Sequence, residues 1–437
     1  MVSLQDISQL EISTFILSFV KEQNFKSNFI VQDLVMSKPT VLISGAGIAG
    51  SVCAYFLSRA GFHTTVVERA PELRKAGQQI DIRGAALKIV RRMGLEETVR
   101  SKTTKEAGLA FMDTNGKRLA EFPVDEKGGM SFTCEIEIVR AELAKIFYDA
   151  SKEDTEYVFG DHVMALEEKS DKIEVTFASG SKKEYDLVIG ADGMGSKIRR
   201  LVFPDQNVMK GLGQYTSFFT IPYEEDDGTW GQWYNAAGGR CILLRPDNTG
   251  YTRAYLSVMS SKPTGYYKLS IPEQKKLFRE IFEDAGWQAQ RVLDGMDKSD
   301  DFYMQEIAQV KMERWSKGRV ALVGDAGYCP SPISGMGTSL AIIGAYILAG
   351  ELGACKGDWG KGLKSYEQKM KPFVTKAQSL PPGAPAILNP QSAWGITILN
   401  NVVGFVSWSG LANGISAVAN RFSGPEKEDK RLPLYVF

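Results

Sequence analysis

The first clear hydrophobic pattern in the chain is a short apolar strand that leads through a glycine-rich turn into a helix. Residues 41–43 form a run typical of a buried strand, and from residue 52 to 57 the apolar positions change to helical spacing. A second strand is expected over 64–67, rich in β-branched residues, and it ends at Glu68. This order of strand, glycine-rich turn, helix and strand, with an acidic residue at its end, predicts an α/β unit with a dinucleotide site at its turn.

Further along, the pattern changes from α/β to aromatic strands and then to helices. Strands are expected near 163–166, 173–177 and 187–189, and antiparallel aromatic strands near 215–221, 230–234, 241–245 and 251–259. Helices are expected over 85–93, 137–147, 272–285, 288–293, 339–352 and 359–380. We therefore predict an N-terminal extension (1–37), a discontinuous dinucleotide-binding domain (38–210 and 300–355), an inserted antiparallel-sheet substrate domain (211–299) and a C-terminal helical region (356–437).

Composition excludes several classes of function. In 437 residues, Lys plus Arg and Asp plus Glu are 52 each, so nothing in the net charge favours nucleic acid. Five scattered cysteines without C-x-x-C spacing predict a reducing, cytoplasmic location and no structural zinc, and two histidines make a His-rich metal site or a His-dependent triad improbable.

Two apolar stretches raise the question of targeting or membrane contact. The stretch 12–20 is preceded by the acidic residues Asp6 and Glu11, whereas a signal peptide carries positive charge before its apolar part. We therefore do not interpret this stretch as a secretion signal. The uncharged stretch 394–420 is interrupted by Asn, Gly and Ser, so a packed helix is favoured over a membrane span.

The glycines of the first turn have the spacing G-x-G-x-x-G. Gly45 would allow a sharp turn, Gly47 would leave room for a pyrophosphate, and Gly50 would let helix and strand pack closely. Backbone N–H groups at the helix start would face the phosphates. Glu68, about twenty residues on, suits a ribose without a 2'-phosphate. FAD and NAD both remain open at this point.

Two later turns also follow apolar strands. Residues 190–196 contain Asp192, and Gly324-Asp325 is followed by a proline-rich and glycine-rich loop, 330–338, before a long helix. That helix start again suits an anion. Arg140, in the first turn of its predicted helix, is at the less usual end for a cation. A partner anion or simple solvation would explain it.

Together these turns resemble the FAD sites of the group A flavoprotein monooxygenases, which include para-hydroxybenzoate hydroxylase and the tetracycline-inactivating monooxygenases. The resemblance covers about 39–380 and implies a Rossmann-like, glutathione-reductase-like FAD-binding fold. It implies an FAD monooxygenase that uses NAD(P)H and molecular oxygen, through a flavin C4a-hydroperoxide, to hydroxylate a small aromatic or polyketide-like substrate. It further implies that the cofactor is held by Gly45, Gly47, Ala49, Gly50, Glu68, Arg69, Asp81, Arg83, Arg140, Asp192, Asp325, Pro332, Gly335, Met336, Gly337 and Thr338.

The chain departs from the family pattern in the third motif. Gly327-Tyr328 stands where alanine and histidine are common, Met336 where glutamine is frequent, and Gly344 where an aspartate is usual. These changes fit a subgroup, and they leave the substrate undefined. The segment Trp230-Gly-Gln-Trp233 is not the W-x-W-x-I-P of flavin halogenases, so halogenation is disfavoured.

The expected chemistry belongs to the flavin, and no protein residue is assigned as catalytic. Aromatic strand residues could line a pocket or be core, and we name as tentative substrate contacts Tyr215, Trp233, Tyr234, Arg245 and Tyr255. Two alternatives remain open. One is a flavin oxidase or dehydrogenase that inserts no oxygen, and the other is a non-catalytic flavin-binding protein that contacts a membrane or partner through 394–420.

Overall fold

The computed structural model describes residues 38–74, 77–124, 134, 136–204, 208–247, 249–260, 264–381, 383–409 and 431–437. The chain divides into Met1–Pro39 and Thr40–Phe437. The predicted N-terminal extension, 1–37, lies outside the described residues, and the fold below is that of Thr40–Phe437.

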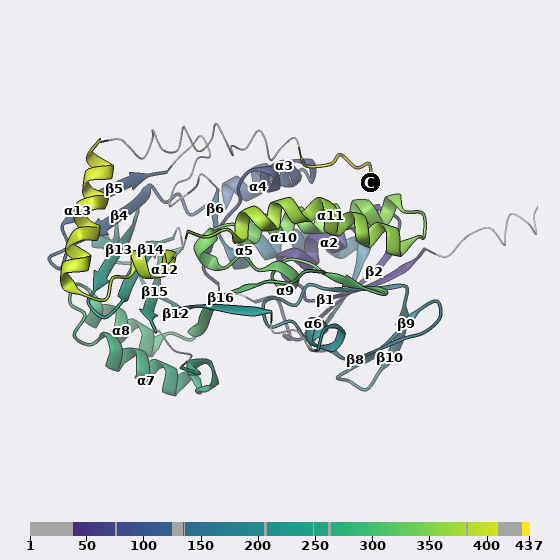
Figure 1. The fold of residues 1–437 in the computed structure, drawn as a ribbon, viewed down its shortest axis with the longest axis horizontal. Helices are drawn as coiled ribbons and strands as arrows, with labels where there is room; N and C mark the ends of the chain where they lie inside the picture. Colours follow the sequence, from purple (N-terminus) through teal and green to yellow (C-terminus); the bar gives the residue numbers. More distant parts are fainter. Residues whose placement is uncertain are drawn as a thin grey trace, which may run out of the picture. The chain divides into compact units, whose positions relative to one another are not determined.

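A six-stranded sheet carries the glycine-rich turns (Figure 1). Its order is β17 (Ser316–Lys317), β18 (Val320–Leu322), β11 (Leu187–Gly190), β1 (Thr40–Ser44), β2 (His63–Glu68) and β7 (Thr155–Phe159). All neighbours are parallel except β17 and β18. Helix α2 (Ile48–Arg59) connects β1 to β2, which confirms the predicted α/β unit.

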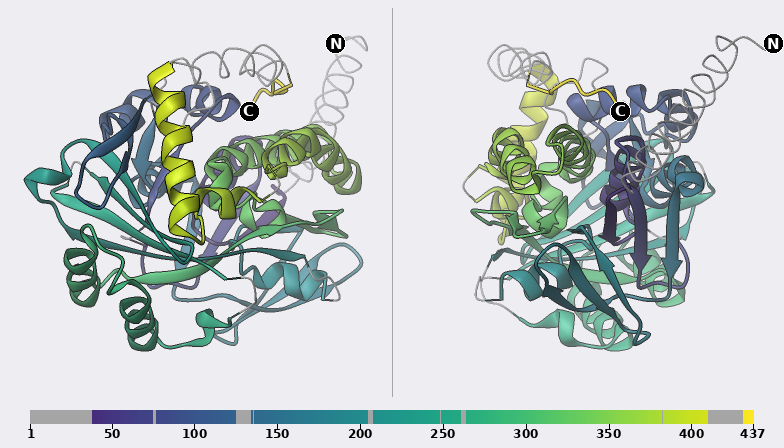
Figure 2. Two further views of the ribbon diagram at one scale, coloured as in Figure 1. Left: turned by 60° about the vertical axis from the view of Figure 1, so that its left-hand side comes forward. Right: turned by 90° about the vertical axis from the view of Figure 1, so that its right-hand side faces the viewer.

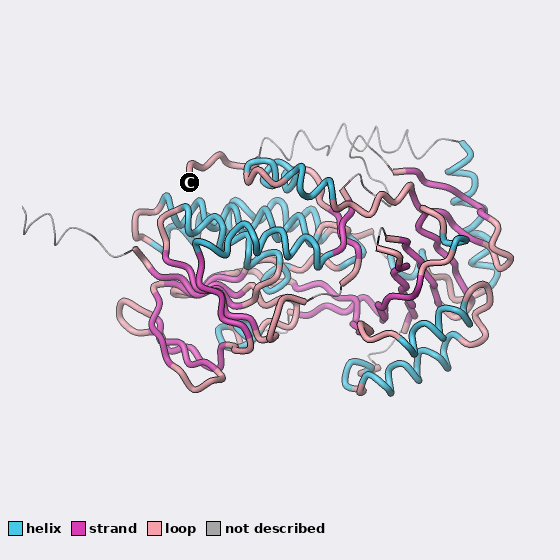
Figure 3. The backbone as a smooth tube through the Cα atoms, turned by 180° about the vertical axis from the view of Figure 1, so that it is seen from behind, coloured by secondary structure: helices cyan, strands magenta, loops and turns pink. Residues whose placement is uncertain are grey.

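Helices cover this sheet around one central apolar helix, α10 (Gly337–Ala354). It packs against α2, α3 (Ala85–Arg92) and α11 (Trp359–Gln378), and α5 (Arg140–Ser151) packs on α2. Figure 3 shows these helices gathered on one side of the strands. Among the described helices, only α10 is long and apolar enough to cross a membrane, but most of it is buried inside the fold. An apolar helix buried all round is typical of a large core.

A second sheet of seven strands carries the predicted substrate residues. Its order is β16 (Tyr303–Val310), β12 (Met209–Pro222), β15 (Tyr251–Met259), β14 (Arg240–Pro246), β13 (Trp230–Ala236), β4 (Gly108–Met112) and β5 (Arg118–Pro123). It is antiparallel, as predicted, except where β13 meets β4. Helices α7 (Ile271–Phe282) and α8 (Ala289–Lys298) cover one face, with Phe278, Phe282 and Val292 in its core.

Sheet membership differs from the predicted domain boundaries. The strands β4, β5 and β16 lie in ranges assigned to the dinucleotide-binding domain, yet they complete the second sheet. The predicted helix 137–147 is also wrong at its start, because Glu137–Val139 is strand β6, paired with β3 (Gln79–Asp81), and α5 begins at Arg140. A short strand directly before a helix leaves too few residues for its period of two to show.

Smaller elements complete the fold. They are α4 (Glu96–Ser101), β8 (Val163–Glu168), β9 (Ile173–Phe177), β10 (Lys182–Tyr185), α6 (Lys197–Val202), α9 (Asp325–Tyr328), α12 (Ala384–Leu388) and α13 (Ala393–Ser409). Helix α13, yellow in Figure 2, packs on β5 and β13. Its other side exposes Trp394, Phe405 and Trp408. The remainder of the predicted apolar stretch, 410–420, lies outside the described residues.

Candidate flavin site

The three motif turns meet at one edge of the six-stranded sheet. They follow β1, β11 and β18, which are adjacent and parallel, so their carboxyl ends share an edge, where ligands of such sheets bind. A Cβ on Gly45 would lie 2.7 Å from the Ala191 carbonyl oxygen, and one on Gly324 would lie 3.1 Å from the Ala49 Cβ. The turns therefore form one site.

The three glycines of the first turn have the geometry that their spacing predicts. Gly45 has φ +108°, which favours glycine. A Cβ on Gly50 would lie 3.1 Å from the Gly45 carbonyl carbon and still closer to its oxygen. A Cβ on Gly47 would meet nothing within 4 Å, and Gly47 starts α2 without a side-chain cap. This open, uncapped helix start suits a pyrophosphate.

Glu68 ties this turn to the end of β2. Its Oε2 accepts from the Ala46 N–H (2.9 Å) and its Oε1 from the Ala70 N–H (3.0 Å). Each carboxylate oxygen keeps a second lone pair for a ribose hydroxyl. Arg69, the next residue, is exposed.

Arg140 and Asp325 lie further along the site. The Arg140 side chain is exposed and forms no hydrogen bond or ion pair with a described residue, while its backbone N–H donates to the Gln78 carbonyl (3.0 Å). Burial raises the pKa of the Asp325 carboxyl above its ordinary value, and the charge of Arg140 opposes that shift. These two side chains are thus a cation and a carboxylate at hand for the polar chain of a cofactor.

The conformation of the loop 332–338 is fixed by hydrogen bonds among its own backbone and hydroxyl groups. Pro332–Ser334 is a 3-10 turn, and Gly335 has φ +63°. The Ser334 hydroxyl accepts from the Met336 N–H (3.1 Å). Helix α10 then starts at Gly337 and Thr338 without a side-chain cap. Its first N–H groups suit an electron-rich ring edge.

Asp81 and Arg83 lie beside this loop. Arg83 Nη2 donates to Asp81 Oδ2 (2.6 Å), and the Arg83 N–H donates to the Ser339 hydroxyl (3.0 Å). A Cβ on Gly335 would lie 3.3 Å from Asp81 Oδ2, and one on Gly337 would lie 3.8 Å from Asp325 Oδ1. The loop therefore lies next to two of the predicted cofactor-binding carboxylates, those of Asp81 and Asp325.

Asp192 and Arg199 support the second turn. Asp192 Oδ2 accepts from the first two N–H groups of α6, those of Lys197 (2.7 Å) and Ile198 (3.1 Å). Arg199 is buried and donates to the Ala326 carbonyl (2.7 Å), which links the second turn to the third. A direct contact of Asp192 with cofactor or nicotinamide stays a prediction.

The tentative substrate residues lie on two faces of the second sheet. Trp233, Arg245 and Tyr255 face away from α7 and α8, but Tyr215 and Tyr234 are buried in the core beneath those helices. Successive strand residues point to opposite faces, so Trp233 and Tyr234 could not line one pocket. The grouping of all five residues in one pocket is corrected accordingly.

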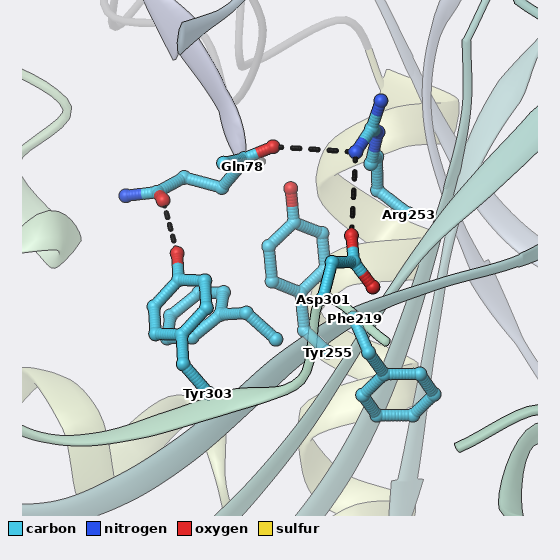
Figure 4. A pocket seen from close by; sticks show the side chains of 8 residues that line it. Gln78, Phe219, Arg253, Tyr255, Asp301 and Tyr303 are labelled. Atoms are coloured by element: carbon cyan, nitrogen blue, oxygen red, sulfur yellow. Dashed lines mark hydrogen bonds and ion pairs between the residues drawn. The ribbon is translucent and has the colours of Figure 1, made fainter. Parts of the chain in front are cut away.

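The face of the second sheet that carries Tyr255 also has residues that were not predicted from the sequence. A small pocket, drawn in Figure 4, is lined by Gln78, Arg253 and Tyr303, among others. Arg253 Nε donates to Asp247 Oδ2 (2.8 Å), and the Tyr303 hydroxyl donates to Gln78 Oε1. Burial raises the pKa of the neighbouring Tyr255 to about 12, so its phenol is neutral. The spacing of Arg253 and Tyr255, two apart on β15, was the available signal.

The third-motif loop also contacts this face. Ile333 packs against the cluster of Phe218, Tyr255 and Ile307. The face that carries Tyr255 and Arg253 therefore adjoins the predicted flavin loop.

Two departures from the family pattern contact each other. The Tyr328 hydroxyl occupies the space that a side chain at Gly344 would need, because a Cβ there would lie 3.1 Å from Tyr328 Cζ and closer to the oxygen. That hydroxyl lies 3.0 Å from the Tyr366 hydroxyl, which donates to the Leu322 carbonyl (2.8 Å). The tyrosine at 328 therefore requires a residue without a side chain at 344, so the two departures depend on each other.

Comparison with known proteins identifies the family of the chain. A family model for an FAD binding domain matches residues 38–380. The FAD-dependent monooxygenase asL6 of Sarocladium schorii is 38% identical over 418 residues, covering 90% of this chain and 97% of the relative. Monooxygenase CTB7 of Cercospora beticola is 38% identical over 423 residues, covering 92% and 99%. The crystal structure of tetracycline destructase Tet(51) is similar, with TM-score 0.74, 32% identity and coverage of 92% of this chain and 100% of that chain.

Proposed function

The chain belongs to the FAD-binding-domain family of flavin-dependent monooxygenases, and on this premise we propose that it hydroxylates a small aromatic or polyketide-like substrate. NAD(P)H would be the reductant, one atom of O₂ would enter the substrate, and the other would leave as water. The observation that carries the proposal is the meeting of three motif turns at one sheet edge, next to a loop that contacts a polar and aromatic face.

The residues present fit FAD along the whole site. The open start of α2 at Gly47 would hold the pyrophosphate and Glu68 the adenosine ribose. Arg140 and Asp325 would hold the polar chain, and the backbone N–H groups of 335–338 the pyrimidine edge. Bound FAD would supply the oxygen transfer, through the C4a-hydroperoxide that the family resemblance implies. The protein would position the substrate and exclude water.

The substrate would bind on the face of the second sheet that adjoins the loop. Trp233 and Tyr255 offer flat apolar contacts there, and Arg253, which lines the small pocket, offers a polar one. The guanidinium of Arg245, on the same face, is already bound by Glu106 and Glu137. Tyr215 and Tyr234 are not part of this proposed pocket. The tetracycline destructase likeness supports a fused-ring, polyketide-like compound. The five cysteines are all free, which supports the proposed cytoplasmic location.

Rapid mixing with NADH or NADPH tests reduction. The FAD-loaded protein, mixed without oxygen, should lose its yellow colour, faster in the presence of substrate. A flavin that never bleaches with either nucleotide and a panel of phenolic and polyketide compounds would rule the proposal out.

Labelled oxygen then separates monooxygenation from oxidation. With ¹⁸O₂, a monooxygenase incorporates one labelled atom into the product. Product without label, together with stoichiometric hydrogen peroxide, would instead identify a flavin oxidase.

A further inference from the structure

A buried cluster of glutamates and one arginine joins β6 to the second sheet. Arg245 donates through Nε to Glu106 Oε2 (2.9 Å) and through Nη2 to Glu106 Oε1 (2.7 Å). The same Nη2 also contacts the carboxylate of Glu137. The side chains of Glu106 and Glu137 are only 1% and 3% exposed. Two carboxyl groups therefore share one guanidinium away from water.

The charges of this cluster do not balance if every carboxyl group is ionised. Glu106 accepts a bidentate hydrogen bond from Arg245, and Asp81 forms an ion pair with Arg83. Glu137 is the third carboxyl group beside two arginines. Neither of its oxygens accepts a hydrogen bond of ordinary geometry from a described residue. One added proton makes the cluster neutral, and Glu137 is the residue whose charge is least compensated.

The surroundings of Glu137 favour its neutral form. Burial raises the pKa of this carboxyl group well above its ordinary value, Arg245 opposes the shift, and Glu106 and Asp81 add to it. The titratable and charged groups around Glu137 are Asp81, Arg83, Glu106, Cys134, Arg245 and Tyr255. Burial raises the pKa of Cys134 and Tyr255, so these two stay neutral beside it.

Glu137 is one cross-strand step from the flavin loop. It lies directly opposite Asp81 in the antiparallel pair of β3 and β6, where Cβ atoms are about 5 Å apart. Asp81 in turn reaches the loop at Gly335. Monooxygenation of a C–H bond by O₂ and NAD(P)H consumes one proton per turnover, which leaves in the water that is formed.

We propose that Glu137 holds a proton in the resting enzyme and supplies it, through Asp81, to the monooxygenation site. The Glu137 O–H bond breaks, the proton passes to the Asp81 carboxylate and on into the site, and Arg245 stabilises the carboxylate that remains. Solvent returns the proton before the next turnover. This inference rests on the proposed monooxygenase function.

Infrared difference spectroscopy of the FAD-loaded protein tests the stored proton without any turnover. The wild type at pH 7 should show a carboxylic acid C=O band that shifts in D₂O and is lost in Glu137→Gln. Glu97→Gln, at an exposed glutamate of α4, is the control and should keep the band. In Glu106→Gln the band should titrate at lower pH, because Arg245 then serves Glu137 alone. Absence of the band, its survival in Glu137→Gln, or an unchanged titration in Glu106→Gln would overturn the shared-proton assignment.

Stopped-flow kinetics test the delivery of the proton. Glu137→Gln should leave flavin reduction by NAD(P)H unchanged, but slow the oxygen-consuming half-reaction about 100-fold, and remove its pH dependence. A wild-type pH profile in this variant would refute proton supply by Glu137. If no substrate is oxygenated but the infrared band behaves as expected, the proposed function fails while the proton assignment stands.

Discussion

Replacing Gly344 by alanine should destabilise the protein even though alanine is the better helix former. The new Cβ would lie 3.1 Å from Tyr328 Cζ, 3.3 Å from Val323 Cγ2 and closer still to the Tyr328 hydroxyl. Tyr328 is fully buried and cannot swing into water. The Tyr328 ring must therefore shift, and this shift breaks the hydrogen bond between the Tyr328 and Tyr366 hydroxyls.

The expected loss of stability combines two destabilising effects and one stabilising effect. Overpacking a core costs about 1–3 kcal/mol, and separating the buried hydroxyls costs about 1–3 kcal/mol. Alanine returns about 1 kcal/mol of helix propensity. We expect the free energy of unfolding to fall by about 3 kcal/mol. In a Tyr328→Phe background, which lacks the obstructing oxygen, the cost of the same change should fall to about 1 kcal/mol.

Urea unfolding at saturating FAD measures these differences. Gly360→Ala is the control, because this exposed glycine of α11 has its nearest obstacle 3.7 Å away, and this change should stabilise slightly. Wild-type stability in Gly344→Ala would refute the reasoning, as would an equal loss in both backgrounds. The paired change Gly344→Asp with Tyr328→His, which restores the common family residues, should be more stable than Gly344→Asp alone.

Three further predictions concern the site. Gly50→Ala should raise the Kd for FAD at least about 100-fold in a flavin-fluorescence titration, because its Cβ would strike the Gly45 carbonyl; affinity like that of the wild type would contradict this packing. Arg199→Met should lower the free energy of unfolding, measured in urea, by about 2–4 kcal/mol, because two backbone carbonyls lose their hydrogen-bond donor. An unchanged free energy of unfolding would argue against a stabilising role for these two hydrogen bonds. Because the pKa of Glu137 is raised in the fold, the native state keeps a proton that the unfolded chain has released. Stability should therefore fall by about 1.4 kcal/mol per pH unit above the ordinary glutamate pKa, until the native carboxyl ionises. The variant Glu137→Gln should lack this slope, and an equal slope in both proteins would refute the assignment.

The turns of the flavin site could be predicted from the sequence because their signals are local. Gly45, Gly47 and Gly50 report backbone geometry within six residues, and Asp325 comes three residues after the end of its strand. The α/β class and the antiparallel character of the second sheet follow from periods of 3.6 and 2 in the same way.

The contacts between residues far apart in the sequence could not be predicted in this way. Arg245 and Glu106 are far apart in sequence, and the three-residue strand at Glu137 was hidden at the start of a predicted helix. Alternation along β13 showed that Trp233 and Tyr234 differ in direction, but which face α7 and α8 would cover depends on tertiary packing.

The way the chain moves back and forth between the two sheets limits how substrate preference could be re-engineered. The hairpin β4–β5 enters the second sheet long before β12, and it forms the edge next to β13. Exchanging residues 209–310 for those of a relative would therefore leave a resident hairpin against a foreign strand. A functional chimera must exchange 108–123 together with that block, and must keep Glu106 matched to the residue at position 245.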